Sequence, residues 1–395
     1  MQIAVAHDYF TQIGGAERVA AELVRMLPGC TLHSTVALPE CMPQNIAGID
    51  VRTTWMQHLP RIRDHYRLYF LLYPFAVGSL KLDNYDLVIS SSSGYAKGVR
   101  TSRDSIHVCY CHTPMRWAWA FDDYSAREAM GPLMRCLLSH VIRGLRHWDV
   151  GASRQPDHFV ANSKAVAARI HTAYGRTAEV IYPPIDISRF HPCSGHEDYY
   201  LVVSRLVSYK RIDLAVDACT ALNRRLVIIG DGPDRPRLEA RAGSSVSFLG
   251  RLEDRDVEYF ASRCSALLFP GEEDFGMVPI EVAAAGRPTI AFRAGGAVET
   301  IIEGETGVFF DRQCPEDLAR AINYSEQQKW SSELLRRHAE LFSIDVFRQS
   351  FHDFFERIGC PVGSRSKPSL TAVPAISFGN RSLGEARGYA PVRGY

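Results

Sequence analysis

Short apolar runs alternate with amphipathic stretches along most of the chain. Near-continuous apolar runs separated by helical patterns indicate parallel sheets whose strands are buried on both faces. Two successive series of runs therefore predict two doubly wound domains of the α/β class. The predicted strands are Ile3–His7, Thr31–Val36, Leu87–Ser90, Ile106–Tyr110, His158–Ala161 and Glu179–Tyr182, followed by Tyr200–Ser204, Leu226–Gly230, Val246–Leu249, Ala266–Phe269, Thr289–Phe292 and Gly307–Phe310.

The two series are separated by the segment Tyr182–Asp186, in which two prolines follow the last strand of the first series. Proline removes a backbone donor and favours extended geometry, and both properties suit a linker. We therefore predict a first domain over residues 1–186 and a second domain over residues 187–360.

The last part of the chain departs from the alternating pattern. A long helical pattern runs from Pro315 to about Glu356, and we expect its final helix to return to the first domain. Residues 361–395 are rich in Ser, Pro, Gly and Arg and show little periodicity, which predicts a disordered tail.

The composition narrows the class of protein. Apolar residues make up 46% and charged residues 23% of the 395 positions, as in soluble globular proteins. The 45 Lys and Arg nearly balance the 44 Asp and Glu, which argues against a nucleic-acid-binding protein. Ten cysteines without a Cys-x-x-Cys pair predict neither a zinc site nor a disulfide framework. Without a secretory signal or a long apolar run, we expect a cytoplasmic protein that does not span a membrane.

Two loops that leave predicted strands carry residues suited to binding phosphate. Gly14 and Gly15 follow the first strand and open a helix, whose free N–H groups attract a phosphate, although a plain tight turn explains a diglycine equally well. Arg205 and Lys210 share one turn after the first strand of the second domain, where two cations can stabilise a departing diphosphate without a metal. A solvated basic loop is the alternative to this second interpretation.

A third loop follows the strand Ala266–Phe269 and is acidic. Glu273 in the loop and Glu281 in the following helix can each accept hydrogen bonds from the vicinal hydroxyls of a sugar. Gly276 and Met277, at the start of that helix, offer backbone N–H groups to a phosphate. An acidic loop with an exposed helical glutamate is the alternative, which the apolar stretch after Glu281 weakens because burying an unpaired carboxylate is costly.

Two histidines lie at the carboxyl ends of predicted strands. His112 follows the strand Ile106–Tyr110 and is a candidate to contact a ligand, although a lone histidine is more often structural. His7 and Asp8 leave the first strand and are candidates to face an acceptor, and a strand-end turn explains them equally well.

Together these features resemble retaining glycosyltransferase family four, which has the GT-B architecture of two Rossmann-like domains with an interdomain cleft. The resemblance covers about residues 1–356. The usual acidic element reads Glu-Gly-Phe-Gly, so Asp274 is a departure at a loop position. The matching elements, in order, are Gly14-Gly15, His112, Arg205 with Lys210, Gly230-Asp231-Gly232, and the run Glu273-Asp274-Phe275-Gly276-Met277-Val278-Pro279-Ile280-Glu281.

The resemblance implies roles for these residues. The backbone N–H of Gly15 would contact the donor phosphate, and Arg205 and Lys210 would hold the diphosphate. Glu281 would bind the ribose, and the Gly230-Asp231 turn would flank the nucleobase. The implied catalytic residues are Arg205, Lys210, His112 beside the donor sugar, and Glu273 on the sugar hydroxyls. The implied donor-binding residues are Gly14, Gly15, Arg205, Lys210, Gly230, Asp231, Glu273, Phe275, Gly276, Met277, Val278 and Glu281.

The resemblance also implies a reaction. The run His112–Trp119 is similar to one found in bacterial mannosyltransferases of polysaccharide assembly, which implies GDP-mannose as the donor. The family resemblance implies front-face transfer, and the pair Arg205 and Lys210 makes a metal unnecessary. The basic and aromatic segments described below lead us to expect a lipid-linked saccharide as the acceptor. The alternatives are a UDP-sugar-dependent enzyme of the same fold, a nucleotide-sugar epimerase, a phosphorylase and a non-catalytic nucleotide-sugar-binding protein. A dehydrogenase is disfavoured because the diglycine lacks the Gly-x-Gly-x-x-Gly spacing.

Two segments of the first domain, residues 55–80 and 134–148, combine arginines with aromatic side chains. Residues 1–182 carry 19 Lys and Arg against 15 Asp and Glu. Arginines attract anionic lipid and aromatic rings enter the acyl boundary, so we predict peripheral contact with the inner leaflet of a membrane. A core helix with a polar face is the alternative for each segment.

Overall fold

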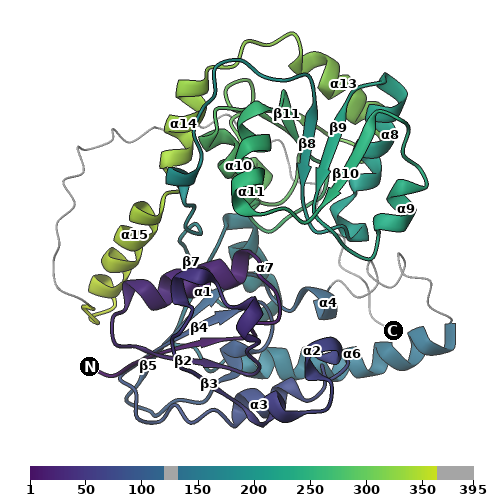
Figure 1. Cartoon of the computed structure of the whole chain (residues 1–395). Coiled ribbons are helices and arrows are strands. Elements are labelled where there is room, and N and C mark those ends of the chain that lie inside the picture. Colours follow the sequence, from purple (N-terminus) through teal and green to yellow (C-terminus); the bar gives the residue numbers. More distant parts are fainter. Residues whose placement is uncertain (120–131, 363–395) are drawn as a thin grey trace. The chain divides into compact units, whose positions relative to one another are not determined.

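A computed structural model describes residues 1–119 and 132–362, and two parallel sheets organise this part of the chain (Figure 1). Seven strands lie in the order β3-β2-β1-β4-β5-β6-β7, and six lie in the order β10-β9-β8-β11-β12-β13. All strand pairs within both sheets are parallel. The predicted α/β class with two Rossmann-like, doubly wound sheets is confirmed.

The strands begin where the apolar runs predict them. A short edge strand, β3, was not predicted because its three residues are at most half-buried and carry little apolar pattern. The first sheet contains β1 (Ile3–His7), β2 (Thr31–Ser34), β3 (Val51–Thr53), β4 (Leu87–Ser92), β5 (Ile106–Cys111), β6 (His158–Ala161) and β7 (Glu179–Val180). The second contains β8 (Tyr200–Val203), β9 (Leu226–Ile229), β10 (Val246–Gly250), β11 (Ala266–Phe269), β12 (Thr289–Phe292) and β13 (Gly307–Phe310).

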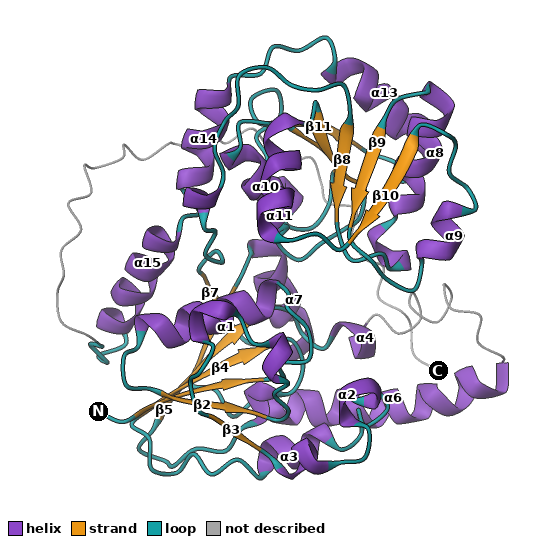
Figure 2. Ribbon diagram, in the orientation of Figure 1, coloured by secondary structure: helices purple, strands orange, loops and turns teal. Residues whose placement is uncertain are grey.

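Helices connect most of the successive strands of each sheet, and within the described residues three further helices follow the last strand, β13 (Figure 2). In the first domain they are α1 (Gly15–Met26), α2 (Ile62–His65), α3 (Tyr73–Gly78), α4 (Arg116–Trp119), α6 (Pro132–Ala152) and α7 (Lys164–Tyr174). In the second domain they are α8 (Ile212–Leu222), α9 (Arg235–Glu239), α10 (Asp254–Arg263), α11 (Met277–Ala284), α12 (Ala297–Thr300), α13 (Pro315–Ser325), α14 (Ser332–Glu340) and α15 (Ile344–Arg357).

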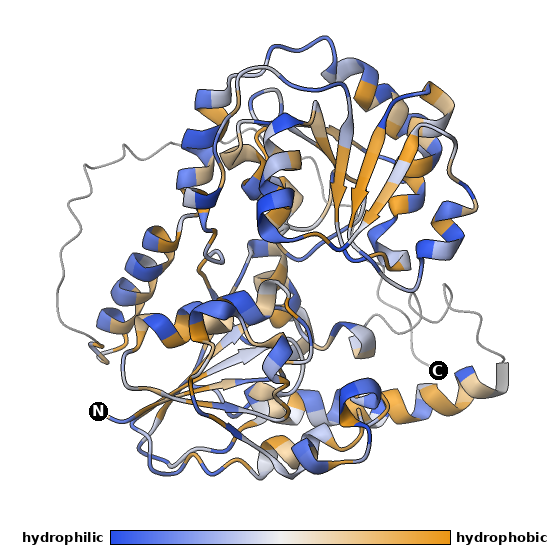
Figure 3. Ribbon diagram, in the orientation of Figure 1, coloured by the Kyte–Doolittle hydropathy of each residue, from blue (hydrophilic) through white to orange (hydrophobic). Residues whose placement is uncertain are grey.

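The cores of both domains form around the buried strands. All five residues of β1 and all four of β9 are buried, and hydrophobic colouring marks β8 and β9 in Figure 3. Each fully buried Val, Leu or Ile contributes about 1.5–3 kcal/mol relative to leaving it in water. This burial fixes the strands, and the loops at their carboxyl ends are held in place as a result.

The helical pattern after Pro315 is divided into three helices. Ser331 and Ser343 cap α14 and α15 by accepting hydrogen bonds from the backbone N–H groups of the third helical residues, so each serine begins a new helix. The sequence pattern was read as one continuous stretch because both serines are followed at once by helical periodicity.

The final helix, α15, packs on the first sheet. Phe347 and Phe351 lie with ring centroids 6.0 Å and 5.8 Å from that of Tyr110 in β5, and Arg348 forms an ion pair with Glu22 of α1. In the sequence, the second domain is therefore inserted between residues of the first domain and the helix α15, which packs on the first domain. Residues Met1–Pro361 form one compact unit.

The predicted disordered tail lies almost entirely at positions 363–395, outside the described residues. Within residues 1–119 and 132–362, no helix has both the length and the apolar character needed to cross a membrane.

Candidate active site

The predicted site residues follow strands at or near the point in each sheet where the order of the strands reverses. In the first sheet β1 lies between β2 and β4, and in the second β8 lies between β9 and β11. Open parallel sheets bind ligands outside the carboxyl ends of strands at such a switch point. Gly14–Gly15 follow β1, Arg205 and Lys210 follow β8, Glu273 follows β11, and His112 follows β5, two strands from β1.

The diglycine turn brings the starts of two helices together. Gly14 caps α1 with extended backbone angles, and Gly15 is the first residue of the helix. A Cβ atom on Gly15 would lie 2.8 Å from the sulfur of Met277, the first residue of α11 in the second domain. A side chain at this position would displace Met277, so the glycine allows α1 and α11 to approach each other.

The two predicted cations have different partners. The Lys210 ammonium forms an ion pair with a carboxylate oxygen of Glu273. Arg205 is exposed, and its Nη1 donates a hydrogen bond to Oε1 of Gln12, 3.0 Å away in the loop before the diglycine. Arg205 therefore reaches across to the diglycine turn, while Lys210 contacts the acidic loop. A phosphate group can compete with a carboxylate or an amide oxygen for either cation.

Glu281 is buried on α11 and is paired across the two domains. Its Oε1 accepts a hydrogen bond from Nη1 of Arg18 in α1 at 3.1 Å, and Arg18 also lies 3.5 Å from Asp254. Burial raises the pKa of Glu281, although Arg18 and Arg189 act in the opposite direction. We predicted no role for Arg18, and its only signal in the sequence was a cation three positions after the diglycine.

His112 belongs to a buried polar chain. The Oγ of Ser91, on β4, lies 2.8 Å from Nε2 of His112 and 3.0 Å from Nδ1 of His7. Burial, and then the charge of the nearby His7, lower the pKa of His112 to about 3, and burial also lowers the pKa of His7. His112 is therefore neutral near pH 7 and can donate or accept a hydrogen bond without carrying a charge.

The carboxylate of Asp8 is bonded to the backbone of the turn that follows β4. Its carboxylate accepts hydrogen bonds from three backbone N–H groups, those of Ser93, Tyr95 and Ala96, at 2.6–2.8 Å. These bonds hold the turn that follows β4. The sequence left open whether Asp8 faces an acceptor or belongs to a strand-end turn. The contacts of its carboxylate are those of a residue that holds a turn.

The glycines of the Gly230-Asp231-Gly232 turn make room for the loop that carries Arg205. A Cβ atom on Gly230 would lie 1.9 Å from the backbone oxygen of Ser204, and one on Gly232 would lie 2.2 Å from that of Leu206. Gly230 also has a positive φ of 129°. Asp231 is exposed and accepts a hydrogen bond from the N–H of Gly232. These glycines therefore fix the position of the basic loop.

The remaining donor-binding candidates lie at the start of α11 and in the core. The side chain of Phe275 is buried, and its ring lies 5.5 Å from Tyr182 and 5.7 Å from Phe342, so only its backbone faces the loop. Gly276 caps α11 with a positive φ of 85°, and Val278 is partly buried against the same core. Among these residues the structure leaves backbone groups, rather than side chains, for a ligand.

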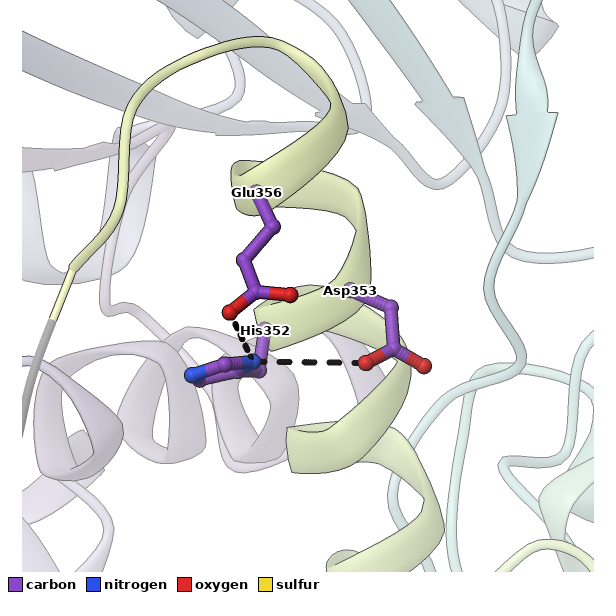
Figure 4. Close-up of side chains that lie close together, drawn as sticks. All are labelled: His352, Asp353 and Glu356. Carbon is purple, nitrogen blue, oxygen red and sulfur yellow. Dashed lines mark ion pairs between the residues drawn. The ribbon is translucent and has the colours of Figure 1, made fainter. Parts of the chain in front are cut away.

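Among residues 1–119 and 132–362, one group of three side chains is close enough to hold a metal ion: His352, Asp353 and Glu356 on α15 (Figure 4). His352 Nδ1 lies 4.0 Å from Asp353 and 3.7 Å from Glu356, and both carboxylates are exposed. Exposed acidic groups of this kind are common without an ion, and none of the three is a predicted site residue. Metal independence stays a prediction.

Comparisons with known proteins match both domains in order. The model of Glycosyltransferase Family 4 matches residues 13–189, and that of Glycosyl transferases group 1 matches residues 186–340. An uncharacterized glycosyltransferase of Methanocaldococcus jannaschii is 27% identical over 231 residues, which are 56% of this chain and 65% of that protein. A GDP-mannose-dependent alpha-(1-6)-phosphatidylinositol dimannoside mannosyltransferase of Mycobacterium tuberculosis is 32% identical over 191 residues, which are 43% of this chain and 50% of that protein.

The chain thus spans between half and two thirds of the length of these two relatives. Among solved structures, Anabaena HepE in complex with UDP-glucose has a TM-score of 0.66 and 18% sequence identity, and the match covers 90% of this chain and 100% of that one. This similarity shows a shared fold. Both family models match in sequence order, and the loops at the two switch points carry the motifs of the resemblance; the chain belongs to glycosyltransferase family 4 and has the GT-B fold.

Proposed function

We propose that the protein is a retaining glycosyltransferase that moves a sugar from a nucleotide diphosphate donor to an acceptor without a metal ion. The observation that carries the proposal is the contact between Lys210 and Glu273 close to the interdomain junction, where Arg205 reaches the loop before the diglycine. Arg205 and Lys210 can bind the negatively charged diphosphate, and the carboxylate of Glu273 can accept hydrogen bonds from sugar hydroxyls. The N–H groups at a helix start can donate hydrogen bonds to a phosphate.

In the proposed reaction the bond between the sugar's anomeric carbon and the diphosphate breaks, and a bond to the acceptor oxygen forms on the same face. Arg205 and Lys210 stabilise the negative charge that develops on the diphosphate. The departing phosphate oxygen takes the acceptor's proton. This assignment is supported by the low pKa of His112, which makes it a weak base, and by the carboxylate oxygens of Asp8, which already accept three backbone hydrogen bonds.

GDP-mannose is the donor that we propose. It is supported by the resemblance of the run His112–Trp119 and by the Mycobacterium tuberculosis relative, which is a GDP-mannose-dependent mannosyltransferase. A UDP-sugar is the second candidate, because the Anabaena structure contains UDP-glucose. That relative is named for phosphatidylinositol dimannoside, which is a glycolipid, and this supports a lipid-linked saccharide as acceptor.

The test is a transfer assay with radiolabelled GDP-mannose, UDP-glucose and other nucleotide sugars, each with and without a membrane lipid extract. We expect label to enter the lipid fraction from GDP-mannose only, and to do so equally in the presence of EDTA. Label in the lipid from a UDP-sugar would replace the donor, and loss of transfer in EDTA would refute metal independence. Conversion of the donor without any acceptor would indicate an epimerase instead.

We further propose that the protein contacts the cytoplasmic leaflet through part of the predicted segment 55–80. Leu68 and Phe75 are 72% and 71% exposed, Leu71 is also exposed, and Arg67 lies beside them. This face is narrower than the segment we predicted, because Tyr73 is buried and the rings of Tyr66, Tyr69 and Phe70 pack against the core. On α6, in the second predicted segment, Met134 and Leu137 are exposed.

Co-sedimentation with vesicles of phosphatidylglycerol and phosphatidylcholine tests this contact. We expect Leu68→Ser combined with Phe75→Ser to reduce binding about tenfold or more, because each buried side chain of this size contributes about 1.5–3 kcal/mol. Tyr324→Ser, at an exposed position on α13 in the second domain, is the matched control. Binding that is equally strong in both variants, or absent in the unmodified protein at low salt, would refute the membrane contact.

A further inference from the structure

Successive residues of the acidic loop contact different domains. Glu273 faces the second domain, where its carboxylate pairs with Lys210 and its backbone oxygen accepts a hydrogen bond from the N–H of Gly296 at 2.8 Å. Its two neighbours, Glu272 and Asp274, contact the first domain. One tripeptide therefore joins the two domains, and the residue in its middle is the one we assign to the donor sugar.

Three residues of the first domain hold this tripeptide. Arg169 on α7 forms ion pairs with both Glu272, at 2.8 Å, and Asp274. Ser163, the cap of α7, donates a hydrogen bond to the backbone oxygen of Asp274 at 2.6 Å. Arg116 on α4 donates to the backbone oxygen of Glu272 at 3.1 Å and lies 3.9 Å from the carboxylate of Asp274.

Arg116 also connects this contact to the basic loop. Its guanidinium lies 4.9 Å from the ring centroid of Tyr209, and the ammonium of Lys210 lies 5.5 Å from the same ring. The side chain of Asp274 is only 20% exposed. Charge-assisted hydrogen bonds that are partly removed from water are stronger than exposed ion pairs. Arg116 and Arg169 both approach the carboxylate of Asp274, which is largely shielded from solvent.

Asp274 occupies the position where the usual family element has glycine. A glycine at this position would have no side chain to pair with Arg169 or Arg116, so these contacts between the domains depend on the aspartate. We call the contacts of Arg116, Ser163 and Arg169 with Glu272 and Asp274 the loop clamp.

We propose that the loop clamp positions Glu273 against Lys210, with Asp274 as a positioning residue, so that the donor-sugar site is complete only while the first domain is docked. The inference rests on the proposed function, because it assumes that Glu273 contacts the transferred sugar. A misplacement of about 1 Å at a reacting group can cost about 10²-fold in rate. Loss of the clamp should therefore lower the turnover number more than it weakens binding of the nucleotide.

The test compares Asp274→Asn with Asp217→Asn. Asp217 pairs with Arg241 within the second domain, so its variant removes one ion pair of similar type away from the loop. We expect Asp274→Asn to lower kcat about tenfold while the affinity for the nucleoside diphosphate, measured by calorimetry, stays within about twofold, and Asp217→Asn to change neither. The conservative Asp274→Glu should recover part of kcat.

A double-mutant cycle with Arg169→Gln and hydrogen exchange complete the test. If the clamp acts as one unit, Arg169→Gln should add little to the loss caused by Asp274→Asn. Backbone amides of residues 271–276 should exchange faster in Asp274→Asn than in the unmodified protein or in Asp217→Asn. Equal kcat values for the two asparagine variants, additive losses in the cycle, or unchanged exchange would overturn the proposal.

Hydrogen exchange also separates this inference from the proposed function. If no nucleotide sugar gives transfer but the loop still loses protection in Asp274→Asn, the clamp is retained as a structural contact and the proposed function fails. If transfer occurs and the variant neither slows it nor loses protection, the proposed function is retained and the clamp fails.

Discussion

Two lysines lie in similar short turns that follow a strand, one in each domain. Lys97 lies in a 3-10 turn, Ala96–Gly98, after β4, and Lys210 lies in a 3-10 turn, Ser208–Lys210, after β8. Each pairs with a carboxylate from another element, Lys97 with Asp149 of α6 at 2.5 Å and Lys210 with Glu273. The local chemistry of the two pairs is the same.

Their surroundings differ. The side chain of Lys97 is 1% exposed, and the rings of Trp148 and Tyr174 lie 6.0 Å and 5.6 Å from its ammonium. The second oxygen of Asp149 accepts hydrogen bonds from Trp119 and Tyr174, both at 2.7 Å. Burial is the largest effect and by itself would lower the pKa of Lys97, but Asp149 and, to a smaller extent, Cys111 and Cys109 together outweigh it, so the pKa is raised.

Lys210 is 15% exposed and pairs with a residue of a loop. A ligand can replace Glu273 as its partner, whereas nothing can reach Lys97. The comparison teaches that an ion pair becomes chemically useful when one partner can be exchanged, and serves the architecture of the domain when both partners are enclosed.

The largest expected effect tests the enclosed pair. Lys97→Met should lower the free energy of unfolding by about 3–5 kcal/mol, because it leaves Asp149 buried and unpaired. Lys210→Met should lower it by less, because Glu273 lies in a loop and its side chain keeps 21% exposure to water. Urea denaturation followed by circular dichroism measures both. Similar losses in the two variants would mean that the pairs do not differ as described.

The second effect tests the exchangeable pair. Lys210→Ala, and separately Arg205→Ala, should reduce the turnover number about 10²-fold or more, because each removes a charge that stabilises the leaving diphosphate. The thermal midpoint should stay close to that of the unmodified protein. Lys81→Ala, at an exposed lysine, is the control. Retained turnover in both site variants would remove the basis of the proposed function.

A smaller effect concerns the partner of Lys210. Glu273→Ala should lower sugar transfer about tenfold, since it removes an acceptor for the sugar hydroxyls. The affinity for nucleoside diphosphate should be unchanged or higher, because Lys210 loses a competing carboxylate. Calorimetry with GDP or UDP and an initial-rate assay separate the two quantities. A weaker nucleotide affinity with normal turnover would contradict this assignment.

The smallest effect extends the burial argument to His112. Its folded pKa of about 3 lies below that of the unfolded chain, so only the unfolded state gains a proton between pH 6.5 and 4. The stabilising contribution of His112 is therefore present above pH 6.5 and is lost as the pH falls. From pH 6.5 to 5.5 the unmodified protein should lose about 1 kcal/mol more stability than His112→Gln. Parallel pH profiles would contradict the buried, neutral histidine.

Much of the fold follows from local pattern. The strands were predicted because parallel strands buried on both faces leave near-continuous apolar runs. The edge strand β3 has no such run, and the caps Ser331 and Ser343 lie inside a helical periodicity that hides them. Local pattern therefore found the buried elements and missed those whose limits depend on edges and capping bonds.

The approach of the candidate loops to one another was predictable from the sequence, and their individual contacts were less so. Loops that follow parallel strands could be predicted to face a ligand without knowledge of the sheet order. The residues that contact these loops could not be predicted, because Arg169 is 105 positions from Asp274 and Arg18 is 263 positions from Glu281. Asp274 was noted only as a departure from the usual element, since its meaning depends on cations that come from the other domain.

The chain crosses between the domains twice, and the two crossings lie together. The backbone N–H of Ile185, in the outgoing segment, donates to the backbone oxygen of Phe342, in the returning segment, at 2.9 Å. The two connecting segments are therefore joined to each other as well as to both domains. Cutting the outgoing segment alone should leave the domains held together through the returning segment and α15.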